Sequence, residues 1–366
     1  MGKVTSFTIL YDRAVDNNIP TYSCGEWVSG RIIVEVNAEI EVKALKIHAK
    51  GQAYVHWTET HRSGSNSNTT RHYTQQIRYF KHKYLLIGVD DSEQLTVLPP
   101  GRHEYPFSLV LPHSPPLPAT FKGPHGNVSY WMTAKLHRPW KLRIKVKEMF
   151  TVLDQIDINV PSLLSPQSAS EEKTICCCCC ASGPISLSAK IERKGYISGE
   201  SIRIFAEIEN NSSRKLVPKA AIYKTQIFRA EGKKKTATEL VTKIEGEPLL
   251  AGKSENWNGM ELKIPAVPPT LMNCSIIQME YSLMIYLDVP SSFNLDVKLP
   301  IVIGTIPLHP VNNQATNYNT QYGMNYNTFN NFSDTLPEGP DAGKPGFLFT
   351  NENPGFQTLG MKNFQE

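Results

Sequence analysis

The sequence predicts an all-β protein with two tandem β-sandwich domains followed by a disordered C-terminal tail. Three observations lead to this class. Apolar and polar residues alternate along short segments, three sequence blocks recur in the same order in both halves, and the composition changes near residue 310. A length of 366 residues accommodates two domains of ordinary size with some sequence left over.

Strand periodicity is the first observation. In segments 28–36 and 45–50, apolar residues alternate with polar ones, as expected when one face of a sheet is buried and the other is in water. Around residues 141–147, we expect Leu142, Ile144 and Val146 to face inward and the cations between them to face water. No long run has the apolar spacing of a helix, so we predict strands throughout.

The internal duplication is the second observation. Each half contains a Tyr-x-x-Gly-Glu block, at Tyr22 and at Tyr196, and two further blocks follow it in the same order. Segments 22–28, 98–112 and 129–136 recur as segments 196–202, 250–265 and 280–287. Two copies of one strand plan predict two similar sandwiches. We assign the greater length of the first copy to a polar loop at 58–74.

The changes in composition set the predicted limits of the domains. We assign residues 5–162 to the first sandwich and residues 185–310 to the second. Residues 163–184 contain Ser, Pro, charged residues and a run of Cys, which is typical of a linker. Residues 311–366 are rich in Asn, Gly and Pro with aromatic residues at no fixed period, which predicts disorder.

Composition and charge exclude several classes of function. Hydrophobic residues make up 40% and charged residues 20% of the chain, as in ordinary globular domains. A net charge of +4 is too mild to indicate a nucleic-acid binder. The sequence lacks an apolar signal region and any apolar stretch of membrane-spanning length, and its consecutive cysteines make a poor disulfide framework. These features predict a cytosolic protein.

The sequence also lacks the residue patterns of an enzyme. Its ten His residues occur without an HExxH, GxSxG or GxxxxGK[ST] motif, and no paired carboxylates end a strand. We therefore predict no catalytic activity, no cofactor and no metal site.

At this point the chain resembles a known family, the arrestin domain-containing proteins or α-arrestins. The resemblance is carried by the pieces YSCGEWVSGRIIVEV, LPPGRHEYPFSLVLP, LPATFKGPHGNVSYWMTAKLHRPW, GPISLSAKIERKGYISGESIRIFAEIENNSSRKLVPKAAIY and LDVKLPIVIGTIPLHP, and it extends over about residues 5–310. It implies two arrestin-like sandwiches in a cytosolic adaptor that binds cytoplasmic parts of membrane receptors or transporters.

The resemblance also implies partners and a location. Such an adaptor regulates the endocytosis, endosomal sorting or ubiquitin-linked degradation of its cargo, and it acts in the cytoplasm, peripherally at the plasma membrane and endosomes. Family members recruit HECT-type ubiquitin ligases through Pro-Pro-x-Tyr motifs, but no Pro-Pro pair follows Pro269 in this sequence. The alternative role is a structural, coat-like subunit of retromer type, which shares the sandwich architecture and needs no ligase motif.

Two places suggest lipid attachment. The first six residues fit the M-G-x-x-x-[ST] pattern for myristoylation of Gly2, although the pattern is permissive. The Cys run in the linker is a candidate for S-acylation, with an unmodified linker and partial metal binding as the alternatives. The run comprises Cys176, Cys177, Cys178, Cys179 and Cys180.

Two groups of cations are candidate contacts for anionic lipid or for an acidic or phosphorylated cargo segment. The alternative for both is an ordinary solvated surface. The first group alternates along a strand, and the second is expected in a hairpin-like loop. The groups are Lys141, Arg143, Lys145 and Lys147, and Lys233, Lys234 and Lys235.

The tail contains two short patterns of the kind that trafficking proteins recognise. Tyr326 and Phe329 form a Tyr-x-x-apolar pattern of the type read by clathrin adaptors. Asn353, Pro354 and Phe356 resemble a short endocytic ligand. Chance is the alternative for both, because the tail is rich in Asn and aromatic residues.

Overall fold

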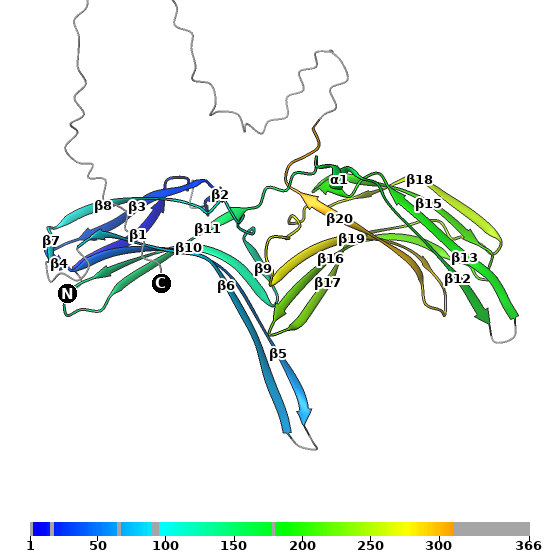
Figure 1. Ribbon diagram of the computed structural model, residues 1–366, viewed down its shortest axis with the longest axis horizontal. Helices are drawn as coiled ribbons and strands as arrows, with labels where there is room; N and C mark the ends of the chain where they lie inside the picture. The colour runs from blue at the N-terminus through cyan, green and yellow to red at the C-terminus, as the bar shows by residue number, and fades with distance from the viewer. Residues whose placement is uncertain (1–2, 15–17, 64–66, 89–94, 178–179, 310–366) are drawn as a thin grey trace, which may run out of the picture. The chain divides into compact units, whose positions relative to one another are not determined.

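The chain is described by a computed structural model that covers residues 3–14, 18–63, 67–88, 95–177 and 180–309 (Figure 1). Within these ranges nearly all regular structure is β-strand, and the one helix, α1 (Pro161–Leu164), has four residues. No helix in the described residues is long and apolar enough to cross a membrane. The predicted all-β class is confirmed, whereas the predicted tail lies outside the described residues.

The N-terminal sandwich contains two main sheets and one short pair. The sheets have the strand orders β1-β3-β8 and β2-β11-β10-β5-β6, with β9 paired to β10, and β4 pairs with β7. The strands are β1 (Val4–Tyr11), β2 (Thr21–Ser23), β3 (Trp27–Val36), β4 (Ile40–Val42), β5 (Ala44–Ser63), β6 (Ser67–Ile87), β7 (Thr96–Leu98), β8 (Gly101–Val110), β9 (Phe121–Gly123), β10 (Gly126–His137) and β11 (Ile144–Leu153). Strands β5 and β6 form a long hairpin that extends beyond the rest of its sheet (Figure 1).

The C-terminal sandwich repeats the two-sheet plan. Its sheets have the orders β12-β13-β15-β18 and β14-β20-β19-β16-β17. The strands are β12 (Gln167–Cys177), β13 (Cys180–Ile191), β14 (Gly195–Ile197), β15 (Ser201–Asn210), β16 (Val217–Ala230), β17 (Lys233–Glu245), β18 (Lys253–Lys263), β19 (Ile277–Asp288) and β20 (Leu295–Gly304).

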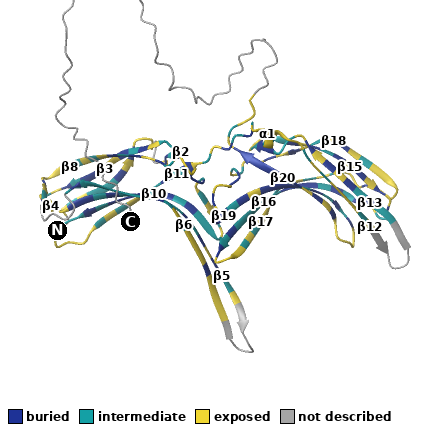
Figure 2. Ribbon diagram, viewed as in Figure 1, coloured by how far each residue is buried: buried dark blue, intermediate teal, exposed yellow. Residues whose placement is uncertain are grey.

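The alternation seen in the sequence builds the core of each sandwich. Along β3, Val28, Ile32 and Val34 are buried while Arg31 is exposed, and the same alternation continues along β5 and β15 (Figure 2). Apolar side chains from the facing sheets therefore meet inside each sandwich, and the other face of each sheet remains at the surface.

The strand pairings show the duplication directly. The Tyr-x-x-Gly-Glu block of each copy includes a short strand, and this strand pairs in parallel with the last strand of its own sandwich. β2 pairs with β11, and β14 pairs with β20. In both copies the hydroxyl of a buried tyrosine donates a hydrogen bond of 2.7 Å to a proline carbonyl, from Tyr130 to Pro118 and from Tyr281 to Pro268.

A polar contact at the start of each sandwich is also repeated. Arg13 donates to the carboxylate of Glu26 at 2.7 Å and lies 4.6 Å from the ring centre of Tyr22. In the second copy, Arg193 donates to Glu200 at 3.1 Å and lies over the ring of Tyr196. Each glutamate also accepts a hydrogen bond from the backbone N–H three residues before it. The two sandwiches thus share side-chain contacts as well as strand order.

Three details differ from the sequence prediction. Most of the predicted linker, 163–184, forms β12 and the beginning of β13. β12 is an edge strand, and its exposed polar side chains resemble linker sequence, which is why the prediction missed it. The predicted loop 58–74 forms the outer parts of β5 and β6 around their turn. Leu142 does not face inward: it is 90% exposed, because β11 begins only at Ile144.

Candidate anion-binding surfaces

One face of the sheet β2-β11-β10-β5-β6 concentrates cations. In the middle of this face, Lys135 of β10 lies opposite Lys46 of β5 and Lys145 of β11. One row further along, His48 of β5 lies opposite Lys83 of β6. We call this set of residues the cationic face. It comprises Lys46, His48, Lys50, Arg78, Lys81, Lys83, Lys135, Arg143, Lys145 and Lys147.

The local sequence explains why these cations share one face. Along β5 and β10, Ile47, Ala49, Ala134 and Leu136 are buried and alternate with the basic residues. Successive side chains of a strand point to opposite faces, so burying these four residues directs their neighbours outward. Register then aligns the outward residues of four strands into a single surface.

Burial and the neighbouring cations both disfavour the charged forms of side chains on this face. Partial burial lowers the pKa of His48 from its ordinary 6.5 to about 4, with further lowering by Lys135, Lys83, Lys81 and Lys46. Burial also lowers the pKa of Lys135, and Lys145 directly opposite lowers it further. The local potential is therefore strongly positive.

Seven of the ten basic side chains of the cationic face have no carboxylate partner among the described residues. Within the described ranges, none of the following side chains forms an ion pair with a carboxylate: Lys50, Arg78, Lys83, Lys135, Arg143, Lys145 and Lys147. Two of these lysines instead lie over Trp131, with the Nζ of Lys147 at 4.1 Å and that of Lys50 at 5.7 Å from the ring centre.

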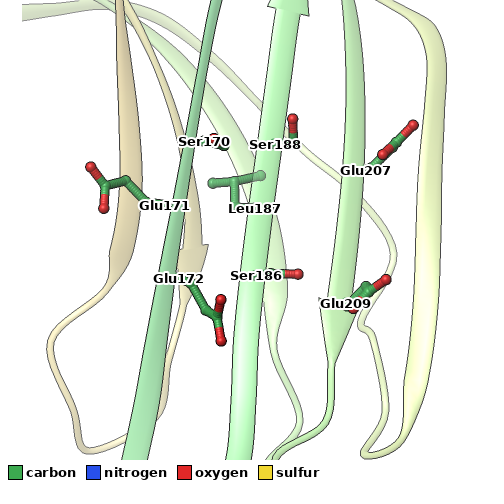
Figure 3. Close-up of a pocket in the computed structure, with 8 residues that line it drawn as sticks. All are labelled: Ser170, Glu171, Glu172, Ser186, Leu187, Ser188, Glu207 and Glu209. Carbon is green, nitrogen blue, oxygen red and sulfur yellow. The ribbon is translucent and has the colours of Figure 1, made fainter.

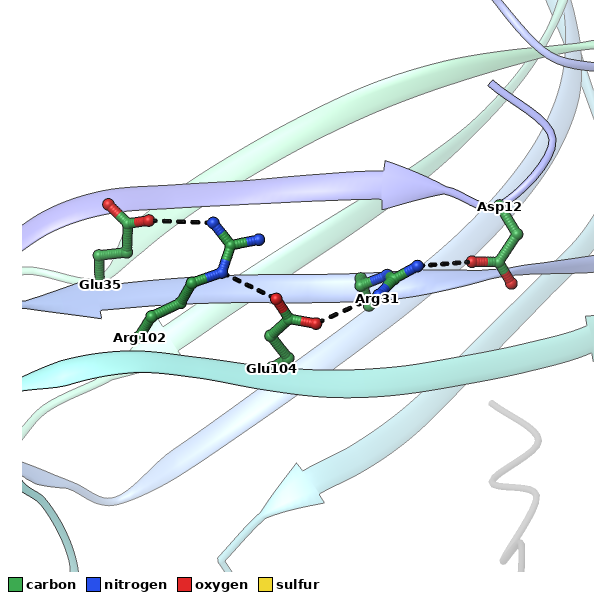
Figure 4. Close-up of polar contacts among 5 residues, drawn as sticks. All are labelled: Asp12, Arg31, Glu35, Arg102 and Glu104. Carbon is green, nitrogen blue, oxygen red and sulfur yellow. Dashed lines mark hydrogen bonds and ion pairs between the residues drawn. The ribbon is translucent and has the colours of Figure 1, made fainter. Parts of the chain in front are cut away.

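The outer face of the other N-terminal sheet shows the contrast. There Arg102 pairs with Glu35 and Glu104, and Arg31 pairs with Glu104 and Asp12 (Figure 4). The pKa of Glu104 is lowered first by its hydrogen bond from Arg102 and then by that from Arg31. This face thus alternates charges of both signs, whereas the seven side chains named above have no carboxylate partner among the described residues.

Part of an outer face of the C-terminal sandwich is acidic. Glu207 and Glu209 of β15, Ser186 and Ser188 of β13, and Glu172 of β12 line a shallow depression there (Figure 3). The described part of the chain contains no cluster of three or more His, Cys, Asp or Glu side chains that could hold a metal ion.

A second basic site lies at the open edge of the C-terminal sandwich. β17 pairs with β16 and is the last strand of its sheet, so one row of its backbone N–H and C=O groups is free of sheet pairing among the described residues. Lys233, Lys234 and Lys235 form the first residues of this strand. An open strand edge that begins with three cations can accept an acidic peptide as a further strand.

Comparison with known proteins identifies the two sandwiches. Residues 11–159 match the family described as "Arrestin (or S-antigen), N-terminal domain", and residues 181–308 match the corresponding C-terminal domain. Arrestin domain-containing protein 4 of Homo sapiens is 38% identical over 342 residues, which cover 93% of this chain and 80% of that protein. The chain belongs to the arrestin domain-containing proteins.

Other relatives agree with this assignment. Arrestin domain-containing protein 4 of Mus musculus is 37% identical over 345 residues, covering 93% of this chain and 81% of its own. Thioredoxin-interacting protein of Sus scrofa is 36% identical over 307 residues, covering 83% of this chain and 75% of its own. Arrestin-family proteins are adaptors that generally lack enzymatic activity and bind receptors and trafficking partners.

In this arrestin-domain chain the first predicted basic group is divided by the start of β11. Lys145 and Lys147 lie in β11 on the cationic face, Arg143 joins the same face just before the strand begins, and Lys141 is exposed in the preceding turn. Lys233, Lys234 and Lys235, expected in a loop, instead begin β17 next to its turn.

Most of the predicted lipidation and sorting residues lie outside the described part of the chain. Cys176, Cys177 and Cys180 lie in the β12–β13 hairpin, and Cys177 of β12 lies opposite Cys180 of β13 in the strand register. Gly2, Cys178, Cys179 and the tail residues Tyr326, Phe329, Asn353, Pro354 and Phe356 lie outside the described residues. Lipidation and sorting signals remain predictions.

Most of the cationic face was not identified from the sequence. Lys46, His48 and Lys50 alternate along β5, and Lys81 and Lys83 alternate along β6, so each strand carries a signal of its own. The signal that was missing is the register, because only pairing across four strands shows that these short patterns form one surface.

Proposed function

We propose that this arrestin-domain protein is a cytosolic adaptor that binds cytoplasmic segments of membrane receptors or transporters and regulates their endocytosis, endosomal sorting or ubiquitin-linked degradation. Membership of an adaptor family supports this role. The observation that carries it is the open edge of β17, which begins with Lys233, Lys234 and Lys235.

The proposed mode of cargo binding is strand addition. Backbone groups along the free edge of β17 would bind an extended cargo segment, and the three lysines would favour acidic or phosphorylated segments at one end. Edge lysines also protect a sheet against aggregation. The middle of β17, from Thr236 to Leu240, contains no proline or lysine that would block an added strand.

Proximity labelling in cells tests this proposal. The full chain should label membrane receptors or transporters, and a variant with Lys233→Gln, Lys234→Gln and Lys235→Gln should label several-fold less of the same cargo. A matched variant, Lys190→Gln with Lys298→Gln, should behave like the parent because both side chains are exposed away from the β17 edge. Equal cargo labelling by all three proteins would contradict strand addition on β17.

The same experiment examines the other expected partners. A version ending near residue 310 should lose contacts with clathrin adaptors if the tail patterns serve as sorting signals. HECT-type ligases should be labelled only weakly, because the Pro-Pro-x-Tyr motif is missing. Stable, stoichiometric co-purifying subunits would instead favour the retromer-type coat.

A further inference from the structure

The turn between β10 and β11 exposes two large apolar side chains. Trp140 is 102% exposed and Leu142 is 90% exposed, so both side chains are almost fully exposed to solvent. Trp140 also has a φ of +52°, a left-handed conformation that is uncommon for a bulky residue. Exposed apolar side chains grouped at one turn are characteristic of a surface that meets another apolar phase.

Cations surround this apolar turn. Lys141 and Arg143 flank Leu142 and are themselves exposed. The turn is tied to the start of β5, where the N–H of Lys43 donates to the carbonyl of His137 at 2.8 Å. Burial lowers the pKa of His137, and Arg143 lowers it further, so this turn shares the field of the neighbouring cationic face.

We propose that the cationic face and the Trp140–Leu142 turn together form a docking site for an anionic membrane surface. Lysine and arginine side chains of the face contact lipid phosphates, while Trp140 and Leu142 enter the boundary between headgroups and acyl chains. This site goes beyond the proposed cargo function, because it binds the bilayer itself and not a segment of a membrane protein.

An anionic bilayer complements both the cationic face and the apolar Trp140–Leu142 turn, whereas an acidic peptide complements the cationic face alone. A peptide of sufficient negative charge neutralises the face but offers no apolar layer to Trp140 and Leu142. An anionic membrane offers a plane of phosphates above an apolar boundary, and tryptophan is favoured at that boundary. Lys50 and Lys147 over Trp131 add an aromatic residue with cations on the face itself.

Vesicle co-sedimentation of the purified full chain tests the proposal. The chain should bind vesicles of phosphatidylcholine with about one fifth phosphatidylserine and should not bind vesicles of phosphatidylcholine alone. Binding should weaken as salt rises, because the contacts to lipid phosphates are screened. Trp140 fluorescence, obtained as the difference between the parent and Trp140→Phe, should shift to shorter wavelength on anionic vesicles.

Two variants separate the contributions. Trp140→Ser with Leu142→Ser removes exposed side chains, and Lys145→Gln with Lys147→Gln removes two cations from the face, so neither disturbs the core. Each should reduce binding to anionic vesicles about ten-fold or more. The matched controls are Phe293→Ser, an 89% exposed aromatic in the C-terminal sandwich, and Lys190→Gln with Lys298→Gln, two exposed lysines that belong to neither proposed site. Neither control should change binding.

Two outcomes would overturn the proposal. One is unchanged vesicle binding by the Trp140→Ser, Leu142→Ser variant, and the other is binding to an acidic or phosphorylated peptide with no binding to anionic vesicles. The vesicles contain no cargo protein, so their result is independent of proximity labelling. A failure to bind vesicles would contradict the membrane site without contradicting strand addition on β17. Equal cargo labelling by all variants would contradict strand addition without contradicting the membrane site.

Discussion

At the scale of a single residue, His48 combines partial burial with the charges of the cationic face, and both lower its pKa. Its pKa of about 4 in the folded protein, against an ordinary 6.5, means that the imidazole stays neutral over much of the acidic range. Below pH 6.5 the unfolded chain binds a proton that the folded chain does not. Stability is therefore lost as the pH falls from about 6.5 to about 4 and is level below that window.

We predict that His48→Gln removes this part of the acid sensitivity. The variant should lose roughly 1 to 2 kcal/mol less free energy of unfolding than the parent between pH 7 and pH 4, a value reduced from full linkage because the ring is partly exposed to solvent. Urea denaturation at several pH values measures it, with His103→Gln in β8 as the control. The same pH dependence in parent and His48→Gln would contradict the prediction.

At the scale of the strand pair, β10 and β11 place like charges directly opposite. Lys135 and Lys145 face each other in register, an arrangement that costs stability. A sheet under selection for stability alone would place a carboxylate at one of these positions, as the sheet β1-β3-β8 does with Arg102 and Glu35. The repulsion is consistent with a face that is kept positive for binding.

This arrangement predicts that a substitution that raises stability will weaken binding to anionic vesicles. Lys145→Glu should raise the free energy of unfolding by about 0.5 kcal/mol by converting a repulsion into an attraction across the strands. The same change should weaken binding to anionic vesicles. Denaturation and co-sedimentation on one preparation check both, and Lys298→Glu on β20 serves as the control. A destabilised Lys145→Glu variant would show that the lysine pair is structural.

The strand elements also show how far sequence reasoning reached. Alternation predicted β3 and the first part of β5 well, because buried residues such as Val34 and Ile47 recur at every second position in the sequence. It failed for β12, an edge strand with no buried residue among those described, whose exposed Ser168, Ser170 and Glu172 carry no apolar signal. It also placed Leu142 inside, because a period alone does not show where a strand begins.

The candidate sites depended on information that no single strand contains. Lys145 and Lys147 were identified because they alternate within one segment. Lys135, Lys83 and His48 join them only through register, and Trp140 joins them only because the turn leaves it exposed. Pairing across strands and the exposure of a turn are set by tertiary structure, so the sequence pattern alone does not predict them.

At the scale of the whole molecule, the duplication places equivalent stabilising contacts in two similar sandwiches. Each has one tyrosine hydroxyl that binds a proline carbonyl at 2.7 Å, at Tyr130 and at Tyr281. The two contacts lie in different sandwiches and share no partner. Their energetic contributions should therefore be independent.

We predict that Tyr130→Phe and Tyr281→Phe each lower the free energy of unfolding by about 1 kcal/mol, because each leaves a proline carbonyl without its hydrogen bond. The double variant should show the sum of the two losses. Urea denaturation measures this, with Tyr105→Phe in β8 as the control for removing a hydroxyl. A double variant that loses clearly more than the sum would show that the two sites are energetically coupled, which would contradict the prediction.

The parallel pairing of β14 with β20 has a mechanical consequence. β20 lies between β14 and β19, so the strand from which the chain continues toward its C-terminus is held by hydrogen bonds on both sides. A pull on the chain beyond Gly304 loads these bonds together, in shear along the strand, and does not peel them apart one by one. An unfolding motor that grips this end of the protein meets its greatest resistance at the first strand it reaches.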